Sequence, residues 1–166
     1  MDRRLVALVA FLSIAGIGCG GSGTGTSGGN PNPGTPSNPT CPTSKGTLTA
    51  RVDGALWTSQ CVPAASWVVG TLAVGAVNDV EGLALTANVP VPGNYTGQIG
   101  GAVGSLTRGS GGTAWTSGPG GTMSLVITRL DLQGASGTFS FVAEPLPGTS
   151  ATGTRNVTNG AFDVTF

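Results

Sequence analysis

The chain has 166 residues, with seven basic and seven acidic side chains, a formal net charge of zero at pH 7 and no histidine. Nucleic acid is held mainly by clusters of lysine and arginine, so this charge balance does not favour a nucleic-acid partner. Without histidine the chain lacks the Ser-His-Asp and Cys-His catalytic arrangements and histidine-rich metal clusters. We therefore expect no cofactor and no metal site.

Residues 1–18 have the form of an export signal. Arg3 and Arg4 are followed by residues 5–17, which contain no charge, and then by small residues before Cys19. The apolar run is shorter than the roughly 20 residues that a membrane-spanning helix needs. We therefore interpret it as a cleaved signal peptide.

The residues Gly16-Ile17-Gly18-Cys19 resemble the lipobox of bacterial lipoproteins. The resemblance implies that Cys19 receives a diacylglyceryl group, becomes the new N-terminus and anchors the chain to a membrane. Gly16 departs from the branched aliphatic residue that the family prefers at that place. Gly20, in place of an aspartate, implies the outer membrane of a bacterial cell envelope. The alternative is an ordinary secretory signal with a coincidental cysteine.

Residues 19–40 predict a disordered linker. From Gly20 to Thr40 every residue is Gly, Ser, Thr, Asn or Pro, so the segment has no apolar surface whose burial could offset the entropy cost of ordering. A chain of this length spans roughly 25 Å. It is long enough to hold a domain clear of a membrane surface.

Residues 41–166 predict a single all-β domain. Apolar and polar residues alternate between frequent turn residues, and helical periodicity is weak. Asp53-Gly54 and Asn159-Gly160 are typical two-residue hairpin turns. About ten short strands are expected, over residues 47–52, 55–61, 67–74, 83–89, 102–108, 113–117, 122–130, 137–143, 152–158 and 161–166.

The absence of helices between these strands favours a mainly antiparallel β-sandwich. The alternative is a closed β-barrel that carries a small apolar ligand. In that case Gly70, Gly82, Gly97 and Gly104 would mark the bends of the strands.

Cys41 and Cys61 flank the first predicted hairpin and are expected to form a disulfide. Export places them in an oxidising compartment, and the Asp53-Gly54 turn brings the two ends of the hairpin near each other. The alternative is a pair of free or metal-binding thiols, which would need carboxylates to complete a zinc site.

The carboxylates offer a second hypothesis, a carbohydrate-active enzyme. Asp79 and Glu81 are the closest acidic pair in this domain, and glycosidases use two carboxyl groups. With Asn78 they also provide three oxygen ligands for calcium, fewer than a full site requires. A solvated loop is the commoner role of such a segment, and no catalytic residue is assigned.

Four large aromatic residues are candidates for core packing or for a binding surface. We expect Trp57 and Trp67 to pack in the core. Trp115 lies between two glycine-rich segments and is the better candidate for exposure, and Tyr95 is the second candidate for the binding surface.

Three motifs near the beginning and the end of this domain resemble those of an uncharacterised family of bacterial secreted and lipoprotein β-domains. They are "ARVDGALW" (residues 50–57), "GTFSFVA" (residues 137–143) and "VTNGAFDV" (residues 157–164). The resemblance implies an extracytoplasmic all-β domain and brings no activity. In these motifs Gly54 and Gly160 are expected in turns, and the aromatic residues in the core.

Two classes of function remain. The first is an envelope lipoprotein whose non-catalytic β-domain binds a protein or a glycan or has a structural role, and we prefer it because catalytic motifs are absent. The second is the carboxylate enzyme. The sequence names no ligand and does not say whether the domain is on the periplasmic side or at the cell surface.

Overall fold

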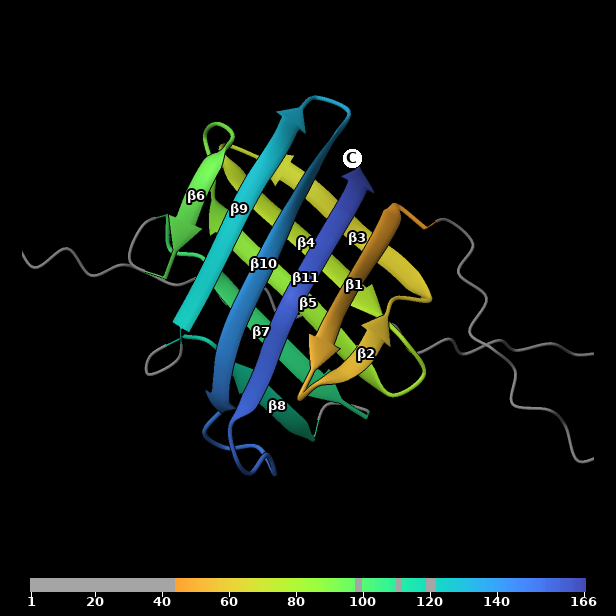
Figure 1. Ribbon diagram of the computed structural model, residues 1–166, viewed down its shortest axis with the longest axis vertical. Coiled ribbons are helices and arrows are strands. Elements are labelled where there is room, and N and C mark those ends of the chain that lie inside the picture. Colours follow the sequence, from red (N-terminus) through yellow and green to blue (C-terminus); the bar gives the residue numbers. More distant parts are fainter. Residues whose placement is uncertain (1–43, 98–99, 110–111, 119–121) are drawn as a thin grey trace, which may run out of the picture. The chain divides into compact units, whose positions relative to one another are not determined.

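The computed structural model describes residues 44–97, 100–109, 112–118 and 122–166, and in this part of the chain the fold is all-β without helix (Figure 1). None of these residues belongs to a helix that is long and apolar enough to cross a bilayer. The eleven strands of the described residues are β1 (Gly46–Val52), β2 (Ala55–Thr58), β3 (Cys61–Val68), β4 (Thr71–Val77), β5 (Glu81–Asn88), β6 (Gly93–Thr96), β7 (Val103–Arg108), β8 (Thr113–Thr116), β9 (Thr122–Asp131), β10 (Gly134–Pro145) and β11 (Arg155–Thr165).

The strands form two layers joined through β10. Sheet A has the order β6-β9-β10-β11-β1-β2, sheet B has the order β8-β7-β5-β4-β3, and every pairing is antiparallel. Most of β10 pairs with β9 and β11, while its last residues, Glu144 and Pro145, pair with β8 of sheet B. The strands at the two ends of this path, β2 and β3, do not pair with each other. The sandwich is confirmed and the closed barrel is wrong.

Buried and exposed side chains alternate along the strands, and the buried ones form the core between the layers. In β1, Leu48, Ala50 and Val52 are buried, while Thr47 and Arg51 are exposed. Successive side chains of a strand point to opposite faces, so each sheet presents one apolar face to the other layer. Figure 1 shows the strands of sheet A crossing in front of those of sheet B.

Two hairpins have two-residue turns in which both residues have positive φ. Asp53 and Gly54 have φ of 51° and 85° and join β1 to β2, as expected. Val69 and Gly70 have φ of 50° and 78° and join β3 to β4. The single strand predicted over residues 67–74 is therefore wrong, because valine does not signal a turn that needs positive φ.

The chain does not turn at Asn159-Gly160, and the prediction of a hairpin there is wrong. β11 runs without interruption through both residues, which lie at a bulge where its register shifts against β1 and β10. Asn159 has φ of 50°, which Asn tolerates better than most residues. Gly160 is buried, so it has a packing role. The short strand β6 has no counterpart among the predicted strands.

Candidate functional site

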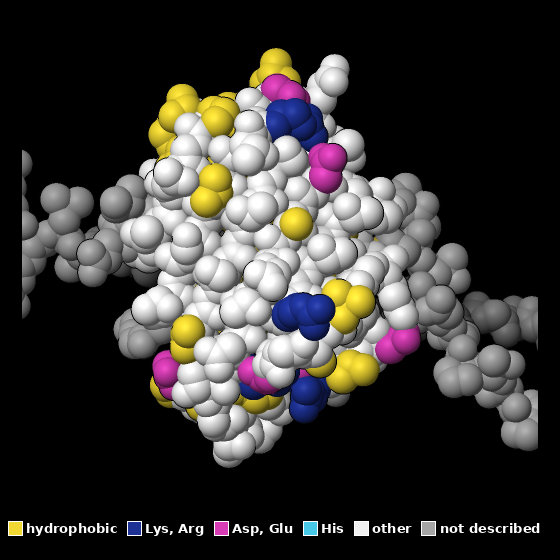
Figure 2. Space-filling view, viewed as in Figure 1, with side chains coloured by type: hydrophobic (Ala, Val, Ile, Leu, Met, Phe, Trp, Pro, Cys, Tyr) yellow, Lys and Arg dark blue, Asp and Glu magenta, His cyan; other side chains and the backbone are white. Residues whose placement is uncertain are grey.

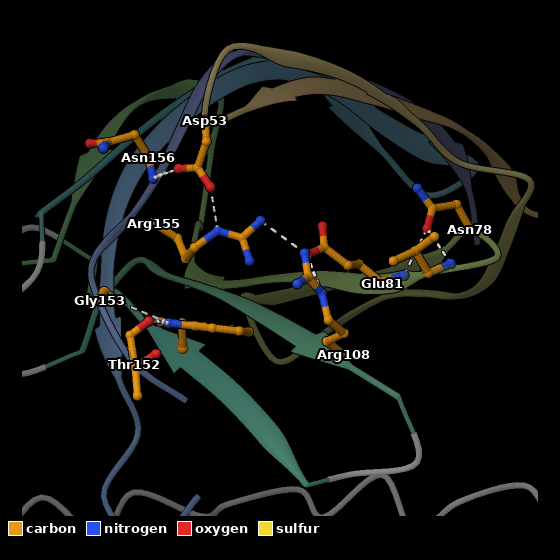
Figure 3. A network of polar contacts seen from close by, with 10 residues as sticks. Asp53, Asn78, Glu81, Arg108, Thr152, Gly153, Arg155 and Asn156 are labelled. Atoms are coloured by element: carbon orange, nitrogen blue, oxygen red, sulfur yellow. Dashed lines mark hydrogen bonds and ion pairs between the residues drawn. The ribbon is translucent and has the colours of Figure 1, made fainter. Parts of the chain in front are cut away.

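Four charged side chains from different parts of the sequence meet at one end of the sandwich (Figure 3). Asp53 lies in the β1–β2 turn and Arg155 is the first residue of β11, both in sheet A. Glu81 begins β5 and Arg108 ends β7, and these two residues are directly paired in sheet B. We call these four residues the ion-pair cluster.

Glu81 is the centre of the ion-pair cluster. Its Oε1 accepts hydrogen bonds from Arg108 Nη2 at 2.6 Å, Arg108 Nε at 3.1 Å and Arg155 Nη2 at 3.0 Å. Arg155 Nε also donates to Asp53 Oδ2. The Glu81 and Arg155 side chains are only 6% and 13% exposed, whereas Arg108 is 51% exposed. Two carboxylates and two guanidiniums cancel in charge, and Arg155 joins the two layers.

Asp53 is held in its ionised form. Burial raises the pKa of its carboxyl. The hydrogen bond from the Asn156 N–H and the Arg155 guanidinium lower the pKa by more than burial raises it, so the pKa lies below its ordinary value of 3.8. The Asn156 N–H donates to Asp53 Oδ1 at 2.8 Å, and the Asp53 N–H donates to the Asn156 carbonyl at 2.8 Å. The β1–β2 turn is therefore fastened to the beginning of β11.

Trp115 forms one wall of the ion-pair cluster. The Arg155 guanidinium carbon lies 4.9 Å from the centre of its ring, a cation–π contact. Its indole Nε1 donates to the Gly153 carbonyl at 2.9 Å. The side chain is 5% exposed, so the prediction that Trp115 is exposed is wrong. The neighbours of Trp115 in the sequence are rich in glycine and offer few side chains to cover its ring. Arg155 and the backbone before β11 cover it instead.

Tyr95 does not form an exposed surface either. It is 8% exposed, and its hydroxyl donates to the Val91 carbonyl. A Cβ added at Gly100 would lie 2.6 Å from the Tyr95 ring, so the glycine makes room for it. Trp57 is buried as expected, with no hydrogen-bond acceptor for its indole N–H among the described residues, and Trp67 is partly buried.

The segment around Asp79 and Glu81 forms a tight loop. Asn78 Oδ1 accepts hydrogen bonds from the N–H groups of Val80 and Glu81 at 2.9 and 2.8 Å, and Asp79 accepts one from Gln60 at 2.6 Å. Asp79 is exposed, as expected of a loop. Glu81 is buried, so the prediction that it lies in a solvated loop is wrong. The three oxygen-bearing side chains bind other parts of the protein. Among the described residues no three His, Cys, Asp or Glu side chains are grouped to hold a metal ion.

Of the cysteines, only Cys61 lies within the described residues. It is the first residue of β3 and is buried. Cys19, the expected lipidation site, and Cys41, the expected disulfide partner, lie outside the described residues. The Cys41–Cys61 pairing and the lipidation stay predictions.

The outer face of sheet A has two adjoining hollows. The larger, of about 380 Å³, is open to solvent over β9, β10 and β11, and the smaller, of about 200 Å³, adjoins it along the same strands. Ser124 and Ser140 line both. Thr138 and Asn159 line the larger one, and none of the described residues that line either hollow is charged. Figure 2 shows this face as largely uncharged.

Sequence patterns do not reveal the ion-pair cluster. Its members are 27, 28 and 47 positions apart in the sequence, and no local spacing joins them. The only available signal is their scarcity: in a domain with few charges, most charged side chains need a partner when they lie near the core.

The fold and these contacts define the molecule as a small all-β sandwich domain. Residues 44–164 match the family model described as "Domain of unknown function (DUF6252)", and the chain belongs to this family. No curated protein matches the chain. The expected membership in an uncharacterised domain family is confirmed, whereas the bacterial lipoprotein part of that expectation stays a prediction.

Proposed function

We propose that this chain is a lipoprotein of the bacterial cell envelope, anchored through Cys19 in the outer membrane, whose β-sandwich is a non-catalytic domain that binds a neutral glycan on the outer face of sheet A. The anchor is supported by the signal-like residues 1–18, the lipobox-like Gly16–Cys19 and the linker composition of residues 19–40. Both of the previously expected binding residues, Trp115 and Tyr95, are buried, so the binding surface is sought elsewhere.

The observation that carries the binding site is the larger hollow on sheet A. Hydroxyl and amide side chains, Ser124, Thr138, Ser140 and Asn159, line it around a neutral surface. Such groups donate and accept hydrogen bonds without charge, which matches the hydroxyl groups of a sugar. A charged ligand would find no countercharge there.

The ion-pair cluster supports a non-catalytic role. A general acid must carry a proton that it can donate, and a nucleophilic carboxylate must be accessible to its substrate. Glu81 is 6% exposed and receives three hydrogen bonds from two guanidiniums. This arrangement favours a carboxylate that stabilises the sandwich.

The anchor is tested by expressing the full chain in a bacterium with a lipoprotein-processing pathway. We expect the wild-type chain in the membrane fraction, with acyl groups on Cys19 detected by mass spectrometry of the N-terminal peptide. The Cys19→Ala variant should lose the acyl groups and the membrane retention. A wild-type chain that is exported and carries no acyl group would contradict the anchor.

The binding face is tested by co-sedimentation of the full chain with an insoluble neutral polysaccharide such as chitin. Ser140→Lys places a long charged side chain in both hollows and should abolish sedimentation. Thr47→Lys, on β1 of the same sheet and outside the hollows, is the matched control and should leave sedimentation unchanged. Equal binding by both variants would contradict the proposed face.

A further inference from the structure

Val69 combines two costly features. Its φ of 50° places it in the left-handed region, and its side chain is 98% exposed. A β-branched residue is a genuine outlier at positive φ, whereas Asn, Asp or Gly would occupy this turn without strain. The β1–β2 turn has the same geometry and uses Asp53 at the equivalent position. Neither the fold nor solvation of the exposed turn explains a valine here.

The turn belongs to a larger exposed apolar surface, which we call the apolar tip. The Val89 N–H donates to the Gly70 carbonyl at 2.6 Å, and Trp67 Nε1 donates to the Val89 carbonyl at 3.0 Å. These bonds hold the β3–β4 turn beside the segment that precedes β6. The apolar tip consists of the partly buried Trp67 and the exposed Val68, Val69, Pro90, Val91 and Pro92.

No charge interrupts the apolar tip within its own segments. Residues 62–78 and 82–107 contain no Asp, Glu, Lys or Arg. Figure 2 shows hydrophobic side chains gathered at this end of the domain, near β6. Exposed apolar surface of this kind, with a tryptophan beside it, is typical of segments that enter the membrane interface.

The apolar tip lies at the end of the domain where the preceding chain joins it. Gly46, the first residue of β1, pairs with Val164, and Gly134, after the β9–β10 turn, pairs with the adjacent Thr165. Gly93 of β6 pairs with Ile127 near the same end of β9, so Val91 extends toward that turn. Leu132, in the turn, is also exposed. Figure 1 shows the start of β1 and the start of β6 at the same end of the sandwich.

We propose that this end of the sandwich faces the lipid bilayer and that the apolar tip inserts into its interface. The inference rests on the proposed anchor at Cys19, because a linker that joins the domain at this end would present it first to the membrane. The charges near this end, Lys45, Arg129, Asp131 and Asp163, sum to zero. A zwitterionic bilayer is therefore the partner, and the contact depends little on salt.

The test uses the full acylated chain reconstituted in phosphatidylcholine vesicles and isolated by flotation. A polarity-sensitive NBD fluorophore is attached to Val91→Cys in the apolar tip or, as the control, to Thr152→Cys next to the ion-pair cluster at the opposite end. The chain without an added cysteine measures background labelling. We expect the label at position 91 to shift to the blue, to be quenched by lipid-borne quenchers and to lose most of its quenching by aqueous iodide. The label at position 152 should behave as in water.

A second variant separates contact with the membrane from a role in folding. Val69→Asn relieves the positive-φ strain and removes the apolar side chain, so we expect a higher melting temperature together with a smaller blue shift at position 91. Val80→Asn changes an exposed valine in the β4–β5 loop, away from the apolar tip, and should change neither reading. A blue shift that Val69→Asn leaves intact would contradict insertion of the turn.

The remaining outcomes also decide the matter. Acylated chains that float with both labels fully quenched by iodide would overturn this inference and leave the anchor intact. Chains without acyl groups on Cys19 that do not float would overturn the anchor and this inference together. A label at position 91 that is shielded equally with and without vesicles would indicate contact with protein, and would likewise overturn the inference.

Discussion

At the scale of single residues, the core depends on phenyl rings that lie against glycines. Phe139 is directly opposite Gly160 across β10 and β11, and Gly137 is directly opposite Phe162 on the same two strands. A Cβ at Gly160 would lie 2.5 Å from the Phe139 ring, and one at Gly104 would lie 2.4 Å from the ring of Phe141 in the other layer. Glycine in a strand weakens it, but here the missing side chain is replaced by a ring from the neighbouring strand or layer.

Gly160→Ala tests this packing. The added methyl group overlaps the Phe139 ring, so the free energy of unfolding should fall by about 1–3 kcal/mol. Gly75→Ala in β4 is the matched control, because its Cβ would lie at an ordinary contact distance of 3.7 Å from Ala64. Urea unfolding followed by tryptophan fluorescence measures both variants. Equal stabilities of the two would mean that the ring moves aside without cost.

At the scale of the elements, the ion-pair cluster links one turn and three strands to one another. The β1–β2 turn is bound to the beginning of β11 through Asp53, and β11 is bound to β5 through Arg155 and Glu81. β5 is bound to the end of β7 through Arg108. Sheets A and B are also joined where the end of β10 pairs with β8 and where the Lys45 N–H, just before β1, donates to the Val62 carbonyl of β3 at 2.9 Å, so this cluster is a further polar connection between the layers.

Glu81→Gln tests the connection. The substitution removes the negative charge between two guanidiniums, one of which is largely buried, and should lower the free energy of unfolding by about 2–4 kcal/mol. Asp163→Asn, which removes an exposed partner of Arg129, is the control and should cost about 0–1 kcal/mol. Chemical denaturation of both variants gives the comparison. A Glu81→Gln loss no larger than that of the control would refute the clamping role.

Asp53 adds a pH dependence to the same connection. Its pKa in the folded state is below the ordinary value of 3.8, so its stabilising contribution is complete above that value and is lost as the pH falls through the lower folded pKa. Asp53→Asn should lower stability at neutral pH and reduce the loss of stability below about pH 4. Unfolding curves measured from neutral to acidic pH for both proteins test this. Parallel pH profiles would contradict it.

At the scale of the whole molecule, the two sheets pack as a sandwich. The two ends of this sandwich differ in chemistry. One end has the neutral ion-pair cluster. The other has the apolar tip and the start of β1, while the outer face of sheet A is neutral and rich in hydroxyl groups. In the function proposed above, the apolar tip would be the membrane side, the outer face of sheet A would be the binding face, and the ion-pair cluster would lie at the end away from the membrane.

The predicted Cys41–Cys61 disulfide would close a loop that contains β1 and β2. Replacing both cysteines by alanine should lower the free energy of unfolding by roughly 3 kcal/mol, because the closed loop restricts the unfolded chain. Peptide mapping under non-reducing conditions should identify the linkage in the exported protein. Free Cys41 in that protein would exclude the pairing.

Local patterns were sufficient wherever a residue's role depends on its neighbours in the sequence. The alternation in β1, β9 and β10 predicts strands with one buried face, and Asp53-Gly54 predicts its hairpin, because side-chain direction and turn geometry are local properties. Val69-Gly70 and Asn159-Gly160 show the limit. Val69-Gly70 forms a turn that its sequence does not signal, and Asn159-Gly160 signals a turn that does not form, because the pairing of neighbouring strands holds a valine at positive φ in the first case and carries the Asn-Gly pair through β11 in the second.

The sequence by itself determined the all-β class and the absence of histidine chemistry, since these follow from composition and from patterns of a few residues, while the envelope address that residues 1–40 suggest stays a prediction. Only the tertiary structure decided that the sheet is open, that Trp115 and Tyr95 are covered, and that Glu81 is buried between two arginines. The open sheet, the cover of Trp115 and the burial of Glu81 depend on side chains or strands that lie tens of residues apart in the chain, and Tyr95 lies on a strand that pairs with the distant β9. Their contact is set by how the two layers pack, which no local pattern encodes.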